Sequence, residues 1–222
     1  MTARSGGLAN LTPLQQLRAP RLPRRLTQLL VGLVLYGVSL AMVLESHLGL
    51  SPWDVLHDGV AKRLPLSFGM VVILVGLVVL LLWWPLREMP GLGTVANVLV
   101  VGVAIDASLL VLEQPASWGG RTALLVGGVV LNGLAGAMYI GAQLGPGARD
   151  GLMTGLVRVT GLSVRVVRTT IEAVVLAVGF LLGGTVGVGT VVYAVAIGPL
   201  VHLFLPLCIV PLDGSEVSGG RR

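Results

Sequence analysis

Charged side chains are scarce in this sequence, and their scarcity excludes an ordinary water-soluble fold. They make up 11% of the 222 residues, whereas a soluble domain carries about 25%. Hydrophobic residues make up 55% of the chain, and its mean hydropathy is +0.93. So little polar surface cannot solvate a globule, and the apolar residues come in long blocks. The composition therefore predicts that lipid surrounds most of the folded chain.

Cysteine and lysine are almost missing. Cys208 is the only cysteine, so the chain cannot form an internal disulfide or a cysteine-based metal site. Lys62 is the only lysine, and the net charge of +5 comes from arginines, most of which flank apolar segments. Such arginines are typical of orientation signals in membrane proteins. Because no soluble basic face is available, we expect no binding to nucleic acid.

Catalytic motifs are missing as well. The chain has no phosphate-binding P-loop, no His/Glu zinc motif and no Gly-x-Ser-x-Gly turn. We therefore predict a protein that is not an enzyme and that holds no cofactor and no metal.

Six apolar stretches have lengths near the ~20 residues that cross a bilayer core of ~30 Å. The first is too long for the apolar part of a signal peptide and lacks a suitable cleavage site, so we expect it to be retained. Residues 1–25 are predicted to form a basic N-terminal tail and residues 209–222 a polar C-terminal tail. The predicted spans are residues 26–44, 68–84, 93–112, 122–140, 164–182 and 189–208.

The basic residues predict how these spans are oriented. With the N-terminus in the cytoplasm, only Lys62, Arg63 and Arg121 fall on the outer side. The other basic residues fall on the inner side, as the positive-inside rule requires, and both termini are then cytoplasmic. They are Arg4, Arg18, Arg21, Arg24, Arg25, Arg87, Arg149, Arg158, Arg165, Arg168, Arg221 and Arg222.

The chain matches itself without a gap when it is shifted by 96 positions, so residues 26–112 and 121–208 form two repeats. Three spans per repeat is an odd number, so the second repeat must enter the membrane from the opposite side. The sequence thus predicts an all-α membrane protein of two inverted three-helix repeats. That architecture is frequent among secondary transporters, an inference that rests on analogy. Matched positions include Gly32 with Gly128, Asp54 with Asp150, Leu66-Ser67 with Leu162-Ser163, and 91–95 with 187–191.

A short amphipathic segment lies between the first two spans of each repeat, at residues 50–60 and 146–156. Ser51 is expected to cap the first of these helices, with Asp54 in its first turn, and Asp150 holds the equivalent place in the second. One interpretation is that both aspartates only cap helix N-termini. The other is that both short helices are re-entrant and line a polar site, rather than lying at the interface. The two are compatible.

Ionisable groups inside the spans are costly in lipid, so they are candidates for a functional site. Arg168 and Glu172 lie four residues apart and are expected to form an ion pair on one helix face. Asp106 and His202 occupy equivalent positions in the two repeats and have no partner within their own helices, which favours a polar pathway. Asn97 and Tyr193 are expected to form hydrogen bonds between helices.

Several segments resemble the signature of the bacterial YczE/YitT-like membrane proteins. The first is Leu48-Gly49-Leu50-Ser51-Pro52-Trp53-Asp54-Val55-Leu56-His57, and the second is Gly145-Pro146-Gly147-Ala148-Arg149-Asp150-Gly151-Leu152-Met153. Residues 90–97, 183–190 and 197–200 fit as well. The chain resembles the short YczE type, because it lacks the soluble C-terminal domain of the YitT type. The resemblance implies a bacterial cytoplasmic membrane and supplies neither a substrate nor catalytic residues.

From these observations we predict a transporter or permease of a small solute or ion, with its site between the inverted repeats. The alternative is an accessory or scaffold protein that supports a biosynthetic or secretion complex. The expected partners are the lipid bilayer, the solute or ion and a second copy of the chain. The candidate pathway residues are Asp54, Arg149, Asp150, Asp106, His202 and Glu172, supported by Ser51, Trp53, His57, Asn97, Tyr193 and Arg168.

Overall fold

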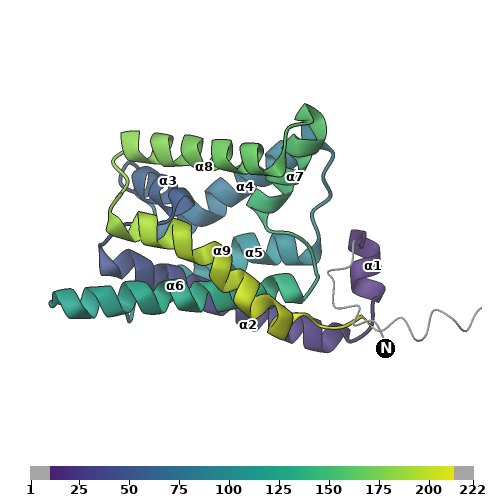
Figure 1. Ribbon diagram of the computed structural model, residues 1–222, viewed down its shortest axis with the longest axis horizontal. Coiled ribbons are helices and arrows are strands. Elements are labelled where there is room, and N and C mark those ends of the chain that lie inside the picture. The colour runs from purple at the N-terminus through teal and green to yellow at the C-terminus, as the bar shows by residue number, and fades with distance from the viewer. Residues whose placement is uncertain (1–10, 213–222) are drawn as a thin grey trace, which may run out of the picture.

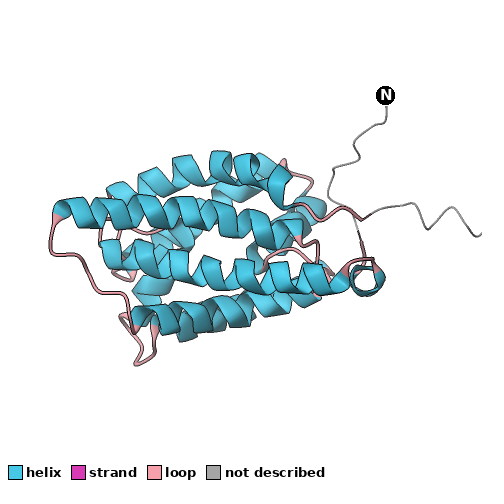
Figure 2. Ribbon diagram, turned by 90° about the horizontal axis from the view of Figure 1, so that it is seen from below, coloured by secondary structure: helices cyan, strands magenta, loops and turns pink. Residues whose placement is uncertain are grey.

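The computed structural model describes residues 11–212, which are entirely helical apart from turns and loops (Figure 1). The all-α prediction is confirmed for this part of the chain. Most of the helices run along the longest axis of the molecule (Figure 2). They are α1 (Pro13–Arg18), α2 (Leu22–Ser46), α3 (Pro52–Ala61), α4 (Phe68–Leu86), α5 (Leu92–Leu109), α6 (Trp118–Gly141), α7 (Ala148–Thr160), α8 (Val164–Leu181) and α9 (Val188–Cys208).

Serine side chains fix where four of these helices begin. The hydroxyl oxygens of Ser51, Ser67, Ser117 and Ser163 each accept the backbone N–H of the residue three positions later. Each bond satisfies a donor that the first helical turn would otherwise leave without a partner. The predicted cap at Ser51 is confirmed.

Five helices are long and apolar enough to cross a membrane: α2, α4, α5, α6 and α9. They coincide with five of the six predicted spans. The remaining predicted span, 164–182, coincides with α8, which is a helix of similar length but contains Arg165, Arg168 and Glu172. Charged groups inside a span are costly, so α8 differs in composition from the other five.

The helices repeat at the same interval as the sequence. Adding 96 to the first residue of α2, α3, α4 and α5 gives 118, 148, 164 and 188, where α6, α7, α8 and α9 begin. Long-range contacts repeat as well. The backbone N–H of Gly93 donates to the carbonyl oxygen of Leu144 at 2.7 Å, and that of Gly189 donates to Leu48 at 2.7 Å. Each half therefore bonds to the other in the same way.

Glycine is required where these matching turns cross. Gly49 and Gly145 have φ angles of +118° and +124°, which disfavour any residue with a Cβ. A Cβ at Gly49 would also lie 2.6 Å from the backbone nitrogen of Gly187, and one at Gly145 would lie 3.1 Å from Cα of Gly91. The glycines that match between the repeats thus allow two chain segments to touch.

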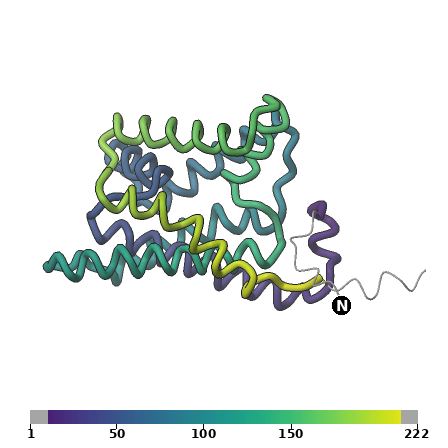
Figure 3. Tube along the Cα trace, in the orientation of Figure 1, coloured from purple at the N-terminus to yellow at the C-terminus, as the bar shows by residue number. Residues whose placement is uncertain are grey.

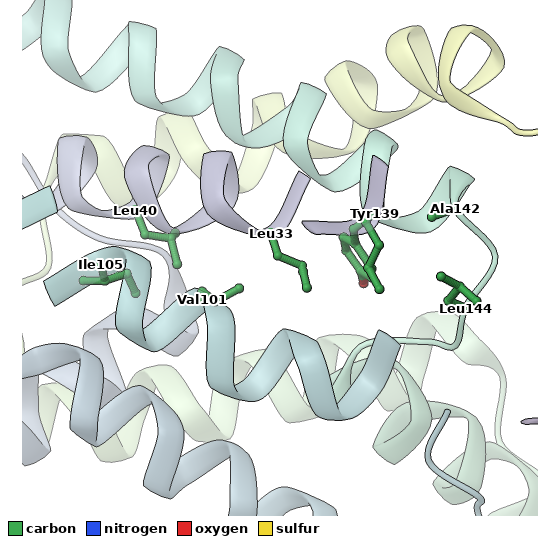
Figure 4. Packing of buried hydrophobic residues seen from close by; sticks show 8 residues of the cluster. Leu33, Leu40, Val101, Ile105, Tyr139, Ala142 and Leu144 are labelled. Carbon is green, nitrogen blue, oxygen red and sulfur yellow. The ribbon is translucent and has the colours of Figure 1, made fainter. Parts of the chain in front are cut away.

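The two halves are interlocked. α2 packs on α6, α5 packs on α2, and α9 packs on α6. The short helix α3 packs on α8 of the other half, and α7 packs on α4. Leu33 and Leu40 of α2 meet Val101 and Ile105 of α5 in one buried cluster (Figure 4). Burying such side chains away from water or lipid gains many close contacts between carbon atoms.

The second buried cluster lies at the other end of α2. It joins Val43 and Leu50 to Leu125, Val129 and Ile197 of the second half. Several members are repeat equivalents of the first cluster, such as Leu125 for Leu29 and Ile197 for Val101. One difference matters for the site, because Val43 stands where the first cluster has Tyr139.

The N-terminal segment is more structured than the expected basic tail. α2 begins four residues before the predicted span, and the side chain of Arg25 is fully buried. Arg25 donates hydrogen bonds to the carbonyl oxygens of Ala142 (2.9 Å), Gln143 (2.6 Å) and Gln16 (2.6 Å). Two of these carbonyls end α6, where a cation offsets the helix dipole. Arg25, which the sequence assigns to the N-terminal tail, is instead a buried residue of α2.

The two ends of the described chain lie together. The guanidinium of Arg21, just before α2, donates to the carbonyl oxygen of Pro211, just after α9, at 3.4 Å. Figure 3 shows the start of α2 and the end of α9 at the same end of the molecule. The chain thus enters and leaves the bundle on one side.

Candidate functional site

A cavity of about 110 Å³ lies inside the bundle and receives side chains from seven helices. Both short helices reach it with their N-terminal turns, α3 from the first half and α7 from the second. The polar residues in its wall are Tyr36, Ser51, Trp53, Asp54, His57, Asn97, Tyr139, Arg149, Asp150 and Tyr193. Valine side chains of α4 and α5 form an apolar wall, made of Val72, Val75, Val79, Val98 and Val101.

Asp54 is buried at the start of α3. Its carboxylate accepts a short hydrogen bond from the hydroxyl of Ser51 and lies 3.3 Å from Nδ1 of His57. The backbone N–H of Asp54 itself donates to the Ser51 hydroxyl at 3.3 Å. Ser51, rather than the carboxylate, thus caps the helix. The carboxylate is held by side chains, so capping does not account for its presence.

Asp150 and Arg149 occupy the first turn of α7. The carboxylate of Asp150 accepts a hydrogen bond of 2.9 Å from the hydroxyl of Tyr139. Nε of Arg149 lies 3.9 Å from the other carboxylate oxygen of Asp150, which is longer than a hydrogen bond. Both side chains keep about a third of their surface open, 38% in each case. An arginine stays protonated at any physiological pH, so the cavity contains a fixed positive charge.

A chain of hydrogen bonds between helices supports the cavity. The Tyr193 hydroxyl donates to Asn132 Oδ1 at 2.7 Å, and the Asn132 side-chain amide donates to the Ser39 hydroxyl at 2.8 Å. The rings of Tyr36 and Tyr139 meet edge to face, with centroids 6.2 Å apart. Buried polar groups of this kind need partners, and the network supplies them. It joins α2, α6 and α9 around the site.

Sequence reasoning missed Tyr36 and Tyr139. All three tyrosines of the chain line the cavity, although tyrosine in membrane proteins gathers at the lipid–water interface. The available signal was the position of Tyr36 in the middle of a predicted span, because a buried hydroxyl requires a polar partner.

The other predicted residues of the second half lie next to the central cavity. Arg168 and Glu172 form the expected ion pair at 3.2 Å and line a cavity of about 60 Å³ together with Arg149. His202 lines another cavity, of about 180 Å³, which also includes Arg149. Arg149 therefore stands where three cavities adjoin.

Asp106 is not brought to this site. Its carboxylate accepts hydrogen bonds from the Ser67 hydroxyl (2.5 Å) and the Gly69 backbone N–H (2.7 Å) at the start of α4. The hydrogen-bond partners that Asp106 lacks within its own helix thus come from the start of α4. The negative charge of its carboxylate also offsets the α4 helix dipole. Asp106 therefore has a structural role, whereas its repeat equivalent, His202, lines a cavity next to the central one.

A larger cavity of about 930 Å³ opens beside α1. Its wall includes Gln16 of α1, Arg87 after α4 and Arg158 of α7. We call this larger cavity the vestibule. Tyr139 and Asp150 line both the vestibule and the central cavity. The hydrogen bond between these two side chains therefore lies where the cavities meet.

Comparison with known proteins places the chain among relatives. The model of a family described as "Family of unknown function (DUF6198)" matches residues 23–206, which is most of the sequence. The chain belongs to this family. The match begins within α2 and ends within α9, so it includes both short helices and all residues that line the central cavity.

Individual relatives agree with this family assignment. An "Uncharacterized protein" of Haemophilus influenzae is 38% identical over 177 residues, which are 80% of this chain and 81% of the relative. The "Uncharacterized membrane protein YczE" of Bacillus subtilis is 32% identical over 187 residues, 83% of this chain and 87% of the relative. The resemblance to YczE is thus confirmed, and with five apolar helices the chain is a membrane protein. No solved structure matches it.

Proposed function

We propose that the chain is a transporter or permease that moves a small solute or ion through the central cavity. One observation carries the proposal. The N-terminal turns of α3 and α7, which come from different repeats, line a single cavity, while the helices lie toward opposite ends of the molecule (Figure 1). Paired helix N-termini facing a shared interior site are typical of secondary transporters.

The proposal includes six membrane crossings in two inverted halves. Each half contributes a short helix that packs on the other half, α3 on α8 and α7 on α4. A two-fold rotation that exchanges the halves accounts for this reciprocity. The contact between Arg21 and Pro211 supports an even number of crossings, because it joins the two ends of the bundle. With five apolar spans, the sixth crossing is α8.

The path in this conformation is wider on one side. The vestibule beside α1 reaches the site at Tyr139 and Asp150. On the opposite side, Val43 replaces the tyrosine and the buried cluster around Leu125 fills the space. We assign the vestibule to the cytoplasmic face of a bacterial cytoplasmic membrane, because Arg87 and Arg158 line it and the positive-inside rule places both on the inner side. Exchange of the two halves would then open the other side.

A labelling experiment tests this proposal without a known substrate. Cys208 is first replaced by serine, and Asn97→Cys then places a thiol in the central cavity. Small membrane-impermeant thiosulfonates are added to one face or the other of sealed vesicles. A transporter exposes position 97 to both faces in turn, so reagent from either side should react. Val60→Cys and Leu156→Cys serve as controls and should each react from one face only, and from opposite faces.

Two results would contradict the proposal. Reaction of the thiol at position 97 from one face alone would argue for an accessory or scaffold protein. Reaction of positions 60 and 156 from the same face would remove the inverted arrangement on which the transport path depends.

A further inference from the structure

The central cavity adjoins an apolar groove whose lining includes exposed side chains of α4 and α8, such as Val78 and Val174. The groove measures about 560 Å³ and lies between α4 and α8, with α3 and α7 at its sides. Leu74 and Val78 of α4 face Ile171 and Val174 of α8 across it. Trp53 belongs to the groove, to the central cavity and to the small cavity beside Arg149. A molecule that extends past Trp53 can therefore occupy polar and apolar space at once.

The guanidinium of Arg149 is the one permanent positive charge in the wall of the central cavity. Asp54 is already engaged by Ser51 and His57, and Asp150 by the Tyr139 hydroxyl. Within residues 11–212 the guanidinium of Arg149 has no carboxylate closer than 3.9 Å. The N-terminal ends of α3 and α7 add partial positive charge to the same cavity. An anion would therefore find donors there, whereas a cation would have to displace existing bonds.

The existing carboxylates limit the charge of that anion. A doubly charged phosphate would add two negative charges beside Asp54 and Asp150, with Arg149 as the one permanent cation in the wall. A carboxylate carries a single charge and fits a guanidinium through two parallel N–H bonds. Val75 and Val79 of α4 line both the central cavity and the groove, so an apolar surface connects the head of such a ligand with the groove.

We propose that the site binds an amphipathic monocarboxylate, with its head on Arg149 and its hydrocarbon tail passing Trp53 into the groove between α4 and α8. This inference rests on the proposed function, because it names the solute class of the same site. It also assigns the groove an occupant, the tail of that ligand, since tail and groove are both apolar and the groove adjoins the cavity that holds the head.

Equilibrium binding of radiolabelled decanoate to the full chain in nanodiscs tests the inference, with empty nanodiscs subtracted. Unlabelled decanoate should compete at least tenfold better than butyrate, because its longer tail reaches the groove. It should also compete at least tenfold better than decanamide or decyltrimethylammonium, which keep the tail and change the head. These comparisons use the unaltered protein and do not depend on the folding of a variant.

Variants locate the two ends of the ligand. Arg149→Gln should lower decanoate affinity at least tenfold, while Arg165→Gln, which removes an exposed arginine of α8, should change it less than twofold. Leu74→Trp, which fills the groove, should weaken decanoate and spare butyrate. Equal competition by decyltrimethylammonium, or unchanged affinity in Arg149→Gln, would overturn the inference.

The failure of this inference is distinguishable from the failure of the proposed function. Two-sided labelling at position 97 without decanoate binding would reject the monocarboxylate alone. Decanoate binding with one-sided labelling would keep the binding site and reject transport.

Discussion

Replacing Gly151 with alanine should destabilise the protein, because α7 has no room for a methyl group against α4. A Cβ at this position would lie 2.6 Å from Cε2 of Trp83 and closer still to ring carbons Cζ2 and Cη2. Carbon atoms in contact prefer about 3.5–4.0 Å, so the ring or the helix must move by about 1 Å or more. The ring has little room to move, because Trp83 is 1% exposed and its indole N–H donates to the carbonyl oxygen of Ala148 at 2.9 Å.

The expected cost follows from these contacts. Overpacking a tight core costs about 1–3 kcal/mol, and disturbing the indole hydrogen bond adds about 1 kcal/mol. Together, overpacking and the disturbed hydrogen bond should lower the free energy of unfolding of Gly151→Ala by about 2–4 kcal/mol. The loss is measured from circular dichroism as the protein unfolds with increasing sodium dodecyl sulfate in mixed micelles.

Two comparisons make this test specific. Gly119→Ala is the matched control, because a Cβ there meets no other atom within 4 Å, and its stability should be unchanged or slightly raised. In the double variant Gly151→Ala with Trp83→Phe, the smaller ring relieves the clash, so the combined cost should fall at least about 1 kcal/mol below the sum of the single costs. If Gly151→Ala is as stable as Gly119→Ala, or if the two costs add, the packing argument is wrong.

Three further predictions concern polar contacts. Arg25→Leu leaves the three carbonyl oxygens that it binds without their donor, and should lower the free energy of unfolding by about 3 kcal/mol or more. Tyr139→Phe removes the hydrogen bond between vestibule and cavity. This hydrogen bond contributes about 1 kcal/mol. Its loss should therefore speed thiosulfonate labelling of Asn97→Cys from the vestibule side by about fivefold. Glu172→Gln leaves Arg168 unpaired in α8; if that helix crosses lipid, the yield of inserted protein should fall, and adding Arg168→Gln should restore it.

Control variants and contradicting outcomes define the tests of these three predictions. Arg24→Leu removes the same charge from an exposed position and should cost less than about 0.5 kcal/mol; an equal loss from both arginines would contradict the buried role of Arg25. Tyr193→Phe leaves the bond of Tyr139 intact and should not speed labelling from the vestibule side. Unchanged insertion of the Glu172→Gln variant would indicate that α8 lies outside the hydrocarbon core.

Residues of different size occupy equivalent interfaces in the two halves. The large ring of Trp83 packs on Gly151 of α7, whereas the equivalent position in the second half is Gly179, which packs on the backbone of Leu56 in α3. Each contact places a glycine against a larger group, but on the opposite partner. A duplicated chain can thus keep one arrangement of helices while side chains of different size fill the two interfaces.

Local features of the sequence predicted where the long helices lie and where α3 begins. Apolar stretches of about 20 residues, serine caps such as Ser51 and the ion pair of Arg168 with Glu172 depend on interactions within a turn or two of helix, or on transfer to lipid. These need no knowledge of which helices are neighbours. The interval of 96 residues was likewise visible in the sequence, and every helix of the bundle follows it.

The contacts between polar groups of different helices could not be predicted from the sequence. Asp54 and Arg149 line one cavity because α3 packs on α8 and α7 packs on α4, each helix against the other half. Asp106 instead binds the start of α4. The burial of Arg25 depends on the end of α6, which lies more than a hundred residues away in the chain. Contacts of this kind follow from how the two halves interlock, and hydropathy and local spacing contain no information about that packing.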